Sequence, residues 1–515
     1  MNKIRTIVLL LATTLLAACG KEPGTGSGDE SGAENVTVKI VPDRTSFINN
    51  PLNGWVMYLG RSWDENFWTS QGYDAIKTSE GNTVKVSDYA GIAYLRTNWA
   101  MLEPSEGNYA WRDPDSRIYK LFKSCTDRGM RLAFRIVIDG RDQGQNTPLY
   151  VINAGAKYYT EGGGNHKTPY PEDPVFQAKF TKFIQEFAKD FNDPAKVDFI
   201  DGFSLGKWGE AHALIFQDNS HKREVFEWFT SLYADNFTNI PLFVNYHRLV
   251  GDPNQNSWTD TVPSDTEPML ESAIAKGYSL RHDAFGMTGY YKSWEKGFVK
   301  AWNFKRPVAM EGGWITGGTH RYWIDPSNAY REGHPEDVRQ GEYDASAEAR
   351  VNLMDLRVGD ETASWFGKCF NLMQDFIGKG GYRLYPDQVS VPESAKSGAR
   401  VTLSHRWLNL GWGYCPTNIP QWNQRYKVAF ALLTATDRPV KVFVAEDTDL
   451  STWLNGKPTS YKTQIELTGV PSGDYKWAVG LVDTTRGNEP GIRMAVESNR
   501  LTKEGWARLN PVTIK

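Results

Sequence analysis

The feature that most constrains the fold is a repeated alternation of short apolar runs with longer amphipathic segments along the middle of the chain. The runs have the length and composition of buried β-strands, and the segments between them carry apolar residues at helical spacing. Eight strand-like runs are found, at residues 54–59, 91–97, 131–138, 199–205, 241–246, 284–288, 308–311 and 354–358. Eight strands alternating with helices predict an α/β fold of the (β/α)8, or TIM barrel, type.

The segments between the runs support this prediction. Residues 115–128, 173–190 and 222–237 each place apolar side chains on one face at helical spacing. Two long polar insertions, 139–172 and 314–344, follow the third and seventh runs. Segments after strands lie at the mouth of a barrel, so we expect both insertions to wall a cleft there.

The character of the chain changes after a helix expected at residues 362–379. Short alternating runs follow, at 400–403, 426–434, 440–444, 464–467, 475–482 and 493–496. This spacing is typical of an all-β sandwich. We therefore predict a barrel over residues 41–381 and a C-terminal β-sandwich domain over residues 382–515.

The first residues have the pattern of an export signal. Lys3 and Arg5 precede an apolar run that is too short to span a bilayer, and the run ends in Leu16-Ala17-Ala18-Cys19-Gly20. This ending resembles a bacterial lipobox, which implies cleavage after residue 18 and lipidation of Cys19; a plain signal peptide is the alternative. Residues 20–40 would then be a flexible tether. We expect a lipid-anchored protein of the bacterial cell envelope, at the outer membrane, on its periplasmic or its external face.

Composition excludes several functional classes. The net charge of −3 offers no electrostatic basis for binding nucleic acid. Cys125, Cys369 and Cys415 are an odd number of widely spaced cysteines, which predicts buried thiols and not a disulfide framework. No run of residues has metal-ligand spacing or the form of a phosphate-binding glycine loop, so neither a metal nor a cofactor is expected. The oligomeric state is left open.

Two glutamates follow strand-like runs that lie three βα units apart. Glu210 comes after the fourth run and Glu311 ends the seventh. In a parallel barrel both carboxylates would meet at the C-terminal mouth, and a pair of carboxylates there is the equipment of a glycosidase. The chain also contains 19 Trp, 24 Tyr and 24 Phe, and flat aromatic faces suit sugar rings. Taken singly, each glutamate is as readily a solvated or capping residue.

Residues 98–111, NWAMLEPSEGNYAW, carry a family resemblance. They resemble the second-strand region of clan A glycoside hydrolases, and among these the β-galactosidase-like family 42. The resemblance implies that Glu210 is the acid/base and Glu311 the nucleophile. Gly209 departs from it, because that clan has Asn before the acid/base. Either Asn245 or His212 serves instead, or the site has departed from the clan's chemistry. The segment around Glu210 also resembles a poorly characterised group of secreted bacterial barrels.

Further substrate-binding candidates come from their positions near the predicted mouth. Arg96 ends the second run and would hold the nucleophile ionised, or alternatively form a salt bridge inside the barrel. The complete set is Arg96, Trp99, Trp208, His212, Asn245, Tyr246, His247, Tyr290, Trp314 and Trp365. Asp139 and Asp142 are additional candidates, whereas His282 and Asp283 are placed at the opposite end because they precede the predicted sixth strand.

These observations predict a lipid-anchored glycoside hydrolase that acts on an oligo- or polysaccharide with retention of configuration. Two alternatives remain: a non-catalytic glycan-binding lipoprotein on a degenerate barrel, and an inverting enzyme that uses another carboxylate. The C-terminal domain would either pack on the barrel, which we favour, or bind glycan through Trp407, Trp412, Tyr414 or Trp422.

Overall fold

The computed structural model describes residues 34–60, 64–141, 144–160, 165–253, 259–285, 289–316 and 334–515. The predicted export signal with Cys19, most of the tether and Asp142 lie outside these ranges. So do parts of both long insertions after the third and seventh strands. Within the described ranges, no helix is both long and apolar enough to cross a membrane.

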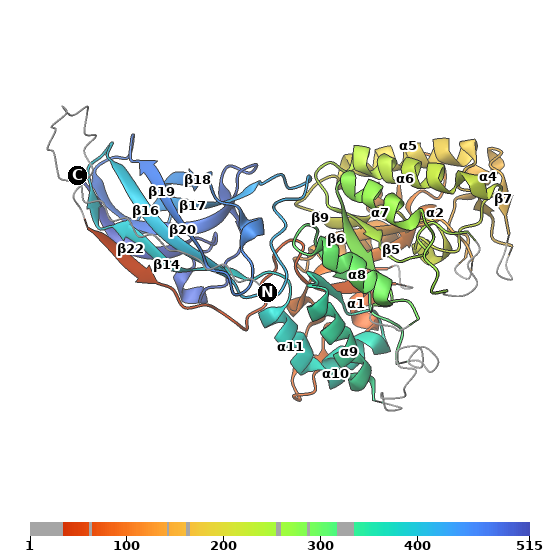
Figure 1. Cartoon of the computed structure of the whole chain (residues 1–515), viewed down its shortest axis with the longest axis horizontal. Coiled ribbons are helices and arrows are strands. Elements are labelled where there is room, and N and C mark those ends of the chain that lie inside the picture. The colour runs from red at the N-terminus through yellow and green to blue at the C-terminus, as the bar shows by residue number, and fades with distance from the viewer. Residues whose placement is uncertain are drawn as a thin grey trace, which may run out of the picture.

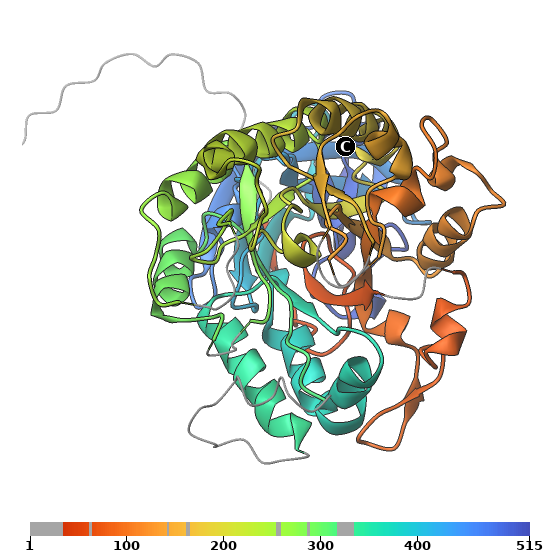
Figure 2. The same cartoon turned by 90° about the vertical axis from the view of Figure 1, so that its right-hand side faces the viewer.

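Eight parallel strands close into a barrel, so the predicted fold class is confirmed. Figure 2 looks at the end of the barrel that faces away from the second domain. In the order of their pairing the strands are β2 (Gly54–Leu59), β5 (Ala90–Asn98), β6 (Arg131–Val137), β9 (Val197–Asp201), β10 (Leu242–Asn245), β11 (Tyr278–His282), β12 (Val308–Met310) and β13 (Leu353–Asp355).

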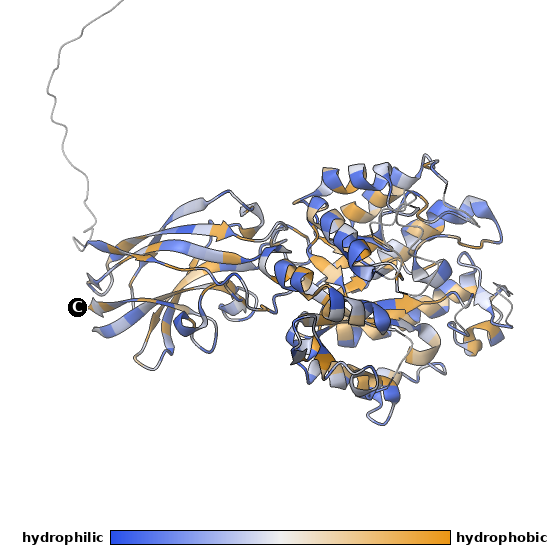
Figure 3. Ribbon diagram, turned by 90° about the horizontal axis from the view of Figure 1, so that it is seen from below, coloured by the Kyte–Doolittle hydropathy of each residue, from blue (hydrophilic) through white to orange (hydrophobic). Residues whose placement is uncertain are grey.

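Helices cover the outside of the barrel and bury aromatic side chains against it. In α5, Asp173 caps the first turn by accepting from the backbone N–H groups of Val175 and Phe176. Figure 3 shows hydrophobic residues on the strands and on the inner helix faces. The helices are α1 (Phe67–Ser70), α2 (Trp99–Leu102), α3 (Arg117–Thr126), α4 (Leu149–Asn153), α5 (Pro174–Phe191), α6 (Lys222–Asn236), α7 (Thr266–Ala275), α8 (Ser293–Trp302), α9 (Pro335–Glu348), α10 (Asp360–Lys368) and α11 (Phe370–Lys379).

The prediction for the sixth strand is wrong. The strand is β11 (Tyr278–His282), not residues 284–288. Arg281 and His282 made this run look like a solvated segment, yet both side chains are buried. The error reversed the placement of Asp283, which follows β11 directly and therefore lies at the C-terminal mouth. The predicted helix at 362–379 is likewise two helices, α10 and α11, which are separated at Cys369.

The C-terminal domain is built from two sheets. One has the order β1-β14-β16-β19 and the other β15-β22-β20-β17-β18, with β21 paired to β20. His405 of β16 contacts Phe430 of β17 at 5.1 Å between ring centres, so the sheets face each other. The strands are β14 (Leu384–Pro392), β15 (Ser394–Ala395), β16 (Arg400–Asn409), β17 (Tyr426–Leu433), β18 (Pro439–Ala445), β19 (Thr459–Glu466), β20 (Gly473–Asp483), β21 (Glu489–Ile492) and β22 (Ala507–Ile514).

The first strand of the chain also belongs to this domain. β1 (Asn35–Lys39) pairs antiparallel with β14, with Val38 opposite Val389. The predicted tether, residues 20–40, is therefore too long at its C-terminal end, and the globular fold begins in the sandwich. The strand predicted at 493–496 is also wrong, because β21 ends at Ile492.

The sandwich packs on the N-terminal end of the barrel, opposite the mouth (Figure 1). Trp412 donates from its indole to the carbonyl of Val351 at 2.8 Å, and Asn352 donates to the carbonyl of Tyr414 at 2.8 Å. Both barrel residues precede β13. The four aromatic residues considered for glycan binding are at most 9% exposed: Trp407, Trp412, Tyr414 and Trp422. They form the core and the domain junction, so they offer no ring face to a sugar.

Candidate active site

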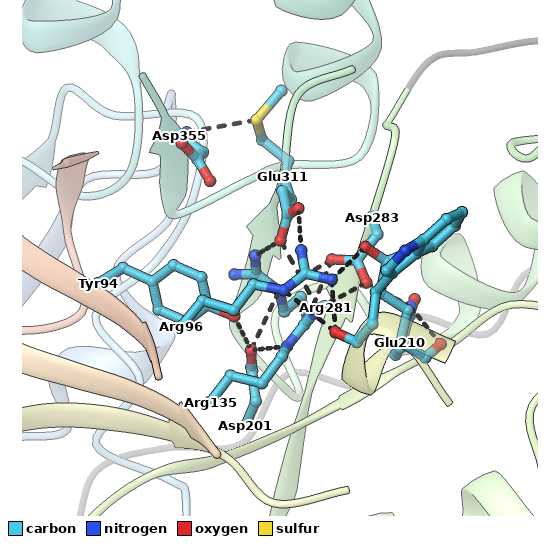
Figure 4. A network of polar contacts seen from close by, with 12 residues as sticks. Tyr94, Arg96, Arg135, Asp201, Glu210, Arg281, Asp283, Glu311 and Asp355 are labelled. Carbon is cyan, nitrogen blue, oxygen red and sulfur yellow. Dashed lines mark hydrogen bonds and ion pairs between the residues drawn. The ribbon is translucent and has the colours of Figure 1, made fainter. Parts of the chain in front are cut away.

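The C-terminal half of the barrel interior is filled by a network of buried charges (Figure 4). Four arginines pair there with carboxylates that come from other strands, and every arginine is at most 8% exposed. Burying this many charges requires mutual pairing, because an isolated ion would lose its hydration. The arginines are Arg96, Arg135, Arg281 and Arg357, and the acids paired with them are Asp201, Glu210, Asp283 and Glu311. A fifth acid, Asp355, lies beside this network and interacts electrostatically with Arg357 and Glu311.

Arg96 on β5 bridges the two predicted glutamates. Its Nη2 lies 2.6 Å from Glu210 Oε1, and its Nη1 lies 3.0 Å from Glu311 Oε1. Because both nitrogens belong to one planar guanidinium, the two carboxylates lie across the width of a single Arg head group. Glu210 and Glu311 therefore do meet at the mouth, and Arg96 contacts both of them.

Glu311 is fully buried and held by three guanidiniums. Oε1 accepts from Arg96 and Arg357, and Oε2 accepts from Arg281. Burial acts to raise the pKa of Glu311, but the arginines, with Arg357 the strongest, outweigh burial and lower it. This carboxylate is therefore ionised at neutral pH.

Glu210 is the more accessible member of the pair, with 13% of its side chain exposed. Its Oε2 lies 3.5 Å from Nε2 of His212. Burial acts to raise its pKa, but Arg96 and then His212 outweigh burial and lower the pKa of Glu210 to about 2. Asp355 behaves in the opposite way, because burial and the nearby Glu311 raise its pKa to about 7 against the effect of Arg357.

The loop that carries Glu210 has an unusual backbone. Trp208, Ala211 and Ala213 have φ of 59°, 64° and 50°, in the left-handed region that residues other than glycine seldom adopt. Each such residue costs on the order of 1–3 kcal/mol and persists only where its surroundings hold it. Three side chains help to stabilise this conformation by donating hydrogen bonds to carbonyls of the loop. Arg96 donates to Trp208, and Asn245 and His247 donate to Glu210 at 3.1 and 3.0 Å.

The local geometry explains Gly209, the departure from the family pattern. Its φ is 70°, and a Cβ placed there would lie 3.2 Å from the Arg135 side chain and 3.2 Å from the carbonyl of Ser204. A larger residue would therefore displace an arginine of the charge network. Glycine at this position follows from the packing of the loop against Arg135.

Asn245 and His247 were predicted to bind substrate, but both donate to the backbone of the loop that carries Glu210. Asn245 donates to Asp283 at 2.8 Å as well as to the carbonyl of Glu210. The backbone N–H of Leu249 donates to Nδ1 of His247, so the ring proton lies on Nε2 and is donated to Glu210. Burial lowers the pKa of His247 well below its usual value, which keeps the ring neutral.

Trp208, Trp314 and Tyr290 are partly exposed residues around the mouth. Nζ of Lys207 lies 4.5 Å from the ring centre of Trp208, and the Arg357 guanidinium lies 4.8 Å from that of Trp314. Tyr290 accepts from Arg248 through its carbonyl at 3.1 Å. Asp139, the remaining described candidate, pairs with Arg141.

Three predicted substrate-binding residues are core residues instead. Trp99 packs against Phe180 and Phe183 of α5, Tyr246 stacks on Phe298 of α8, and Trp365 packs on Trp55. All three are fully buried. Side chains alternate along a strand and just beyond it, so the inward direction of Asn245 sends Tyr246 outward to the helices.

The segment that carries the family resemblance is an anchor for the loop after β5. Glu103 accepts from the Trp99 indole at 2.9 Å, the Tyr150 hydroxyl at 2.6 Å and the Gly107 backbone at 2.8 Å. Trp111 donates to Asp190 of α5 at 2.8 Å. This segment is therefore a structural motif that ties the loop after β5 to α4 and α5.

Sequence reasoning missed most of the charge network. Arg135, Asp201, Arg281, Asp283, Asp355 and Arg357 were not among its site residues. One signal was present, since Arg135 and Arg281 each stand inside an otherwise buried strand, where a charge needs a partner. In the described parts of the chain, no group of three or more His, Cys, Asp or Glu side chains is arranged to hold a metal ion.

Comparison with family models finds no match, and comparison with curated proteins finds none either. Fold and site together define a (β/α)8 barrel with bridged carboxylates at its mouth. Solved structures of similar fold include the catalytic domain of β-amylase from Paenibacillus polymyxa, with a TM-score of 0.41 and 10% identity over 63% of this chain and 97% of that chain. The endo-β-1,4-mannanase of Thermotoga petrophila has a TM-score of 0.37 and 10% identity over 91% of this chain and 98% of that chain.

Endo-glycoceramidase II of Rhodococcus sp., in a lactosyl-enzyme intermediate, has a TM-score of 0.35 and 10% identity over 81% of this chain and 99% of that chain. These neighbours are glycoside hydrolases. At such scores the likeness carries no argument about chemistry in this chain, and the resemblance to family 42 stays a prediction.

Proposed function

We propose that this barrel hydrolyses a glycosidic bond of an oligo- or polysaccharide with Glu311 as nucleophile and Glu210 as acid/base. The observation that carries the proposal is the Arg96 bridge between two carboxylates on loops that follow the fourth and seventh strands. Carboxylates about 5 Å apart suit retention, and those about 6.5–9.5 Å apart suit inversion. Two carboxylates that share one guanidinium favour the shorter spacing.

In this mechanism the ionised Glu311 attacks the anomeric carbon while Glu210 protonates the departing oxygen. A glycosyl ester of Glu311 results, and the leaving group departs as an alcohol. Water then attacks the anomeric carbon, Glu210 takes the water proton, and the ester bond to Glu311 breaks. Ionisation of Glu311 fits the lowered pKa of that residue.

Glu210 needs a proton before it can act as an acid, and Arg96 holds its pKa near 2. A sugar hydroxyl that takes over donors of Arg96 would weaken this ion pair and raise the pKa of Glu210 towards neutrality. The proposal therefore includes a shift of Arg96 when substrate binds.

A panel of aryl glycosides and of plant and host polysaccharides tests the proposal. On the substrate that is cleaved, Glu311→Gln should abolish turnover and Glu210→Gln should reduce it strongly, with circular dichroism showing that both variants fold. NMR of the first product anomer reports retention or inversion. Near-normal turnover of the Glu311 variant would refute the assignment of the nucleophile.

Glycan binding without hydrolysis is a second candidate, and a specific observation favours it. Glu311 is fully buried, and both its oxygens are engaged by arginines, which leaves little room for attack on a sugar. A binder would retain a glycan on an array without releasing product. Its affinity would also survive Glu311→Gln, whereas the hydrolase would yield product from the wild-type chain.

We also propose that a lipid on Cys19 anchors the protein in the bacterial envelope, at the outer membrane. The lipobox-like residues 16–20 support this proposal. In a bacterial host, Cys19→Ala should abolish incorporation of labelled palmitate and move the protein from the membrane fraction to the soluble one. Equal labelling of the two chains would contradict the anchor.

A further inference from the structure

Arg357 differs from the other three arginines of the network. Arg96, Arg135 and Arg281 lie on barrel strands, and each pairs with at least two carboxylates. Arg357 lies two residues beyond the end of β13, on the mouth side. Within the described residues, the carboxylate that its guanidinium pairs with is that of Glu311 alone. Its remaining donor contact is with the carbonyl of Gly312.

Glu311 keeps two arginine contacts without Arg357, although Arg357 is the strongest of the groups that lower its pKa. Arg96 and Arg281 still contact one oxygen each when Arg357 is disregarded, and Arg135 Nη1 lies 3.9 Å from Oε2. These three arginines reach the carboxylate from the barrel wall. Arg357 reaches it from the loop beyond the end of β13.

The surroundings of Arg357 suit a head group that changes partner. Its backbone is fixed, because the N–H donates to Asp355 Oδ1 and the carbonyl accepts from Thr362 at 2.8 Å. Its guanidinium lies 4.8 Å from the ring centre of Trp314 and 5.5 Å from that of Tyr58. Stacked aromatic rings stabilise a guanidinium and leave its in-plane N–H groups available to a carboxylate.

We propose that Arg357 selects a glycan whose reacting sugar carries a carboxylate, of the uronic acid type. This inference rests on the proposed function and names its substrate class. The sugar carboxylate takes the N–H donors of Arg357 in the bidentate geometry that guanidinium and carboxylate prefer. Glu311 then loses its contact with Arg357 and keeps those with Arg96 and Arg281. A neutral sugar has no group of equal strength to draw Arg357 away.

The experiment uses matched substrates that differ only in a carboxylate or a primary alcohol. 4-Nitrophenyl glucuronide is compared with the glucoside, and the galacturonide with the galactoside, in both anomers. Binding of the free uronic acids and of glucose and galactose is measured in parallel by calorimetry, which does not require turnover. The chains are wild type, Arg357→Gln and Arg357→Lys, each checked for folding by circular dichroism and thermal unfolding.

For the wild type we expect kcat/KM and affinity to favour the uronide over its neutral partner by about tenfold or more. Arg357→Gln should erase that preference, because its amide cannot form the charged bidentate pair with the sugar carboxylate; the ratio of kcat/KM, and of affinity, between the uronide and its neutral partner is the readout. Arg357→Lys keeps the charge without the planar fork and should retain part of the preference. If Arg357→Gln proves unstable, the lysine variant alone tests the assignment.

The outcomes separate this inference from the proposed function. A wild type that cleaves glycosides without preferring uronides, or a preference that survives both Arg357 variants, overturns the inference and leaves the hydrolase. Preferential binding of uronic acids without cleavage of any glycoside supports the inference and overturns hydrolysis. A wild type that binds neither sugar of any pair overturns the inference.

Discussion

The two ends of the barrel are stabilised by different kinds of interaction. At the mouth, five carboxylates and four arginines fill the interior, and the Glu210 loop holds three residues other than glycine in left-handed conformations. At the opposite end, neutral hydrogen bonds and aromatic packing join the barrel to the sandwich, as at Trp412. The charge network lies where chemistry is proposed, whereas aromatic packing, neutral hydrogen bonds and the Arg131–Asp198 ion pair stabilise the other end, where Leu52, Phe304 and Arg350 are also left-handed.

The largest expected effect is on catalysis at the mouth. Glu311→Gln should lower kcat by about a thousandfold or more, because an amide cannot form the glycosyl ester. Initial rates on the best glycoside measure this loss. Trp412→Ala, at the end of the barrel that packs on the sandwich, is the control. Assayed at a temperature where it is folded, it should keep kcat within about twofold. Equal loss in both variants would remove the functional distinction between the two ends.

The next largest effect is on stability at the base. Trp412→Ala removes a buried indole that contacts Phe376 and donates to Val351, so the free energy of unfolding should fall by about 3–5 kcal/mol. Urea unfolding monitored by circular dichroism measures the change. A loss below about 1 kcal/mol would show that the junction contributes little to the stability of the fold.

The pH dependence of stability reports the ion pair of Glu210. Its pKa is depressed in the folded chain, to about 2. The stabilisation is therefore fully present above the unfolded pKa of about 4.3 and is lost as pH falls through the folded pKa. Between about pH 5 and pH 2 this group should contribute up to about 3 kcal/mol of the lost stability. The urea midpoints of wild type and Glu210→Gln should differ less at pH 2 than at pH 6. The same difference in midpoint at both pH values would contradict a stabilising ion pair of Glu210.

The smallest predicted effect compares two left-handed glycines. A Cβ at Gly209 would meet the Arg135 side chain, whereas one at Gly129, near the base, would meet nothing within 4 Å. Both alanine variants should lose about 1 kcal/mol from backbone strain. Gly209→Ala should lose a further amount of about 1 kcal/mol, together with activity, because Arg135 must shift. Equal unfolding midpoints and equal activity would show that the mouth loop tolerates the contact.

Parts of the site were predictable and parts were not, for identifiable reasons. Glu210 and Glu311 follow strands whose apolar runs were recognised, and Arg96 lies near the end of another, so their convergence followed from the strand count. Asp283 was misplaced because β11 was not recognised as a strand. Its polar residues Arg281 and His282 do not fit the apolar pattern of a buried strand. Trp99 and Trp365 were misassigned because an aromatic residue near a strand end has the same sequence signature in a core and in a cleft.

By itself, the sequence determined the barrel, the sandwich after it and the meeting of two glutamates at one mouth, because hydrophobic periodicity and strand order suffice for these features. Only the tertiary structure decided what those glutamates contact. The four arginines come from strands or loops that are far apart in the chain, and their pairing depends on which side chains point into the barrel. The left-handed loop and the contact between Arg357 and Glu311 are likewise consequences of packing between distant segments, which no local pattern encodes.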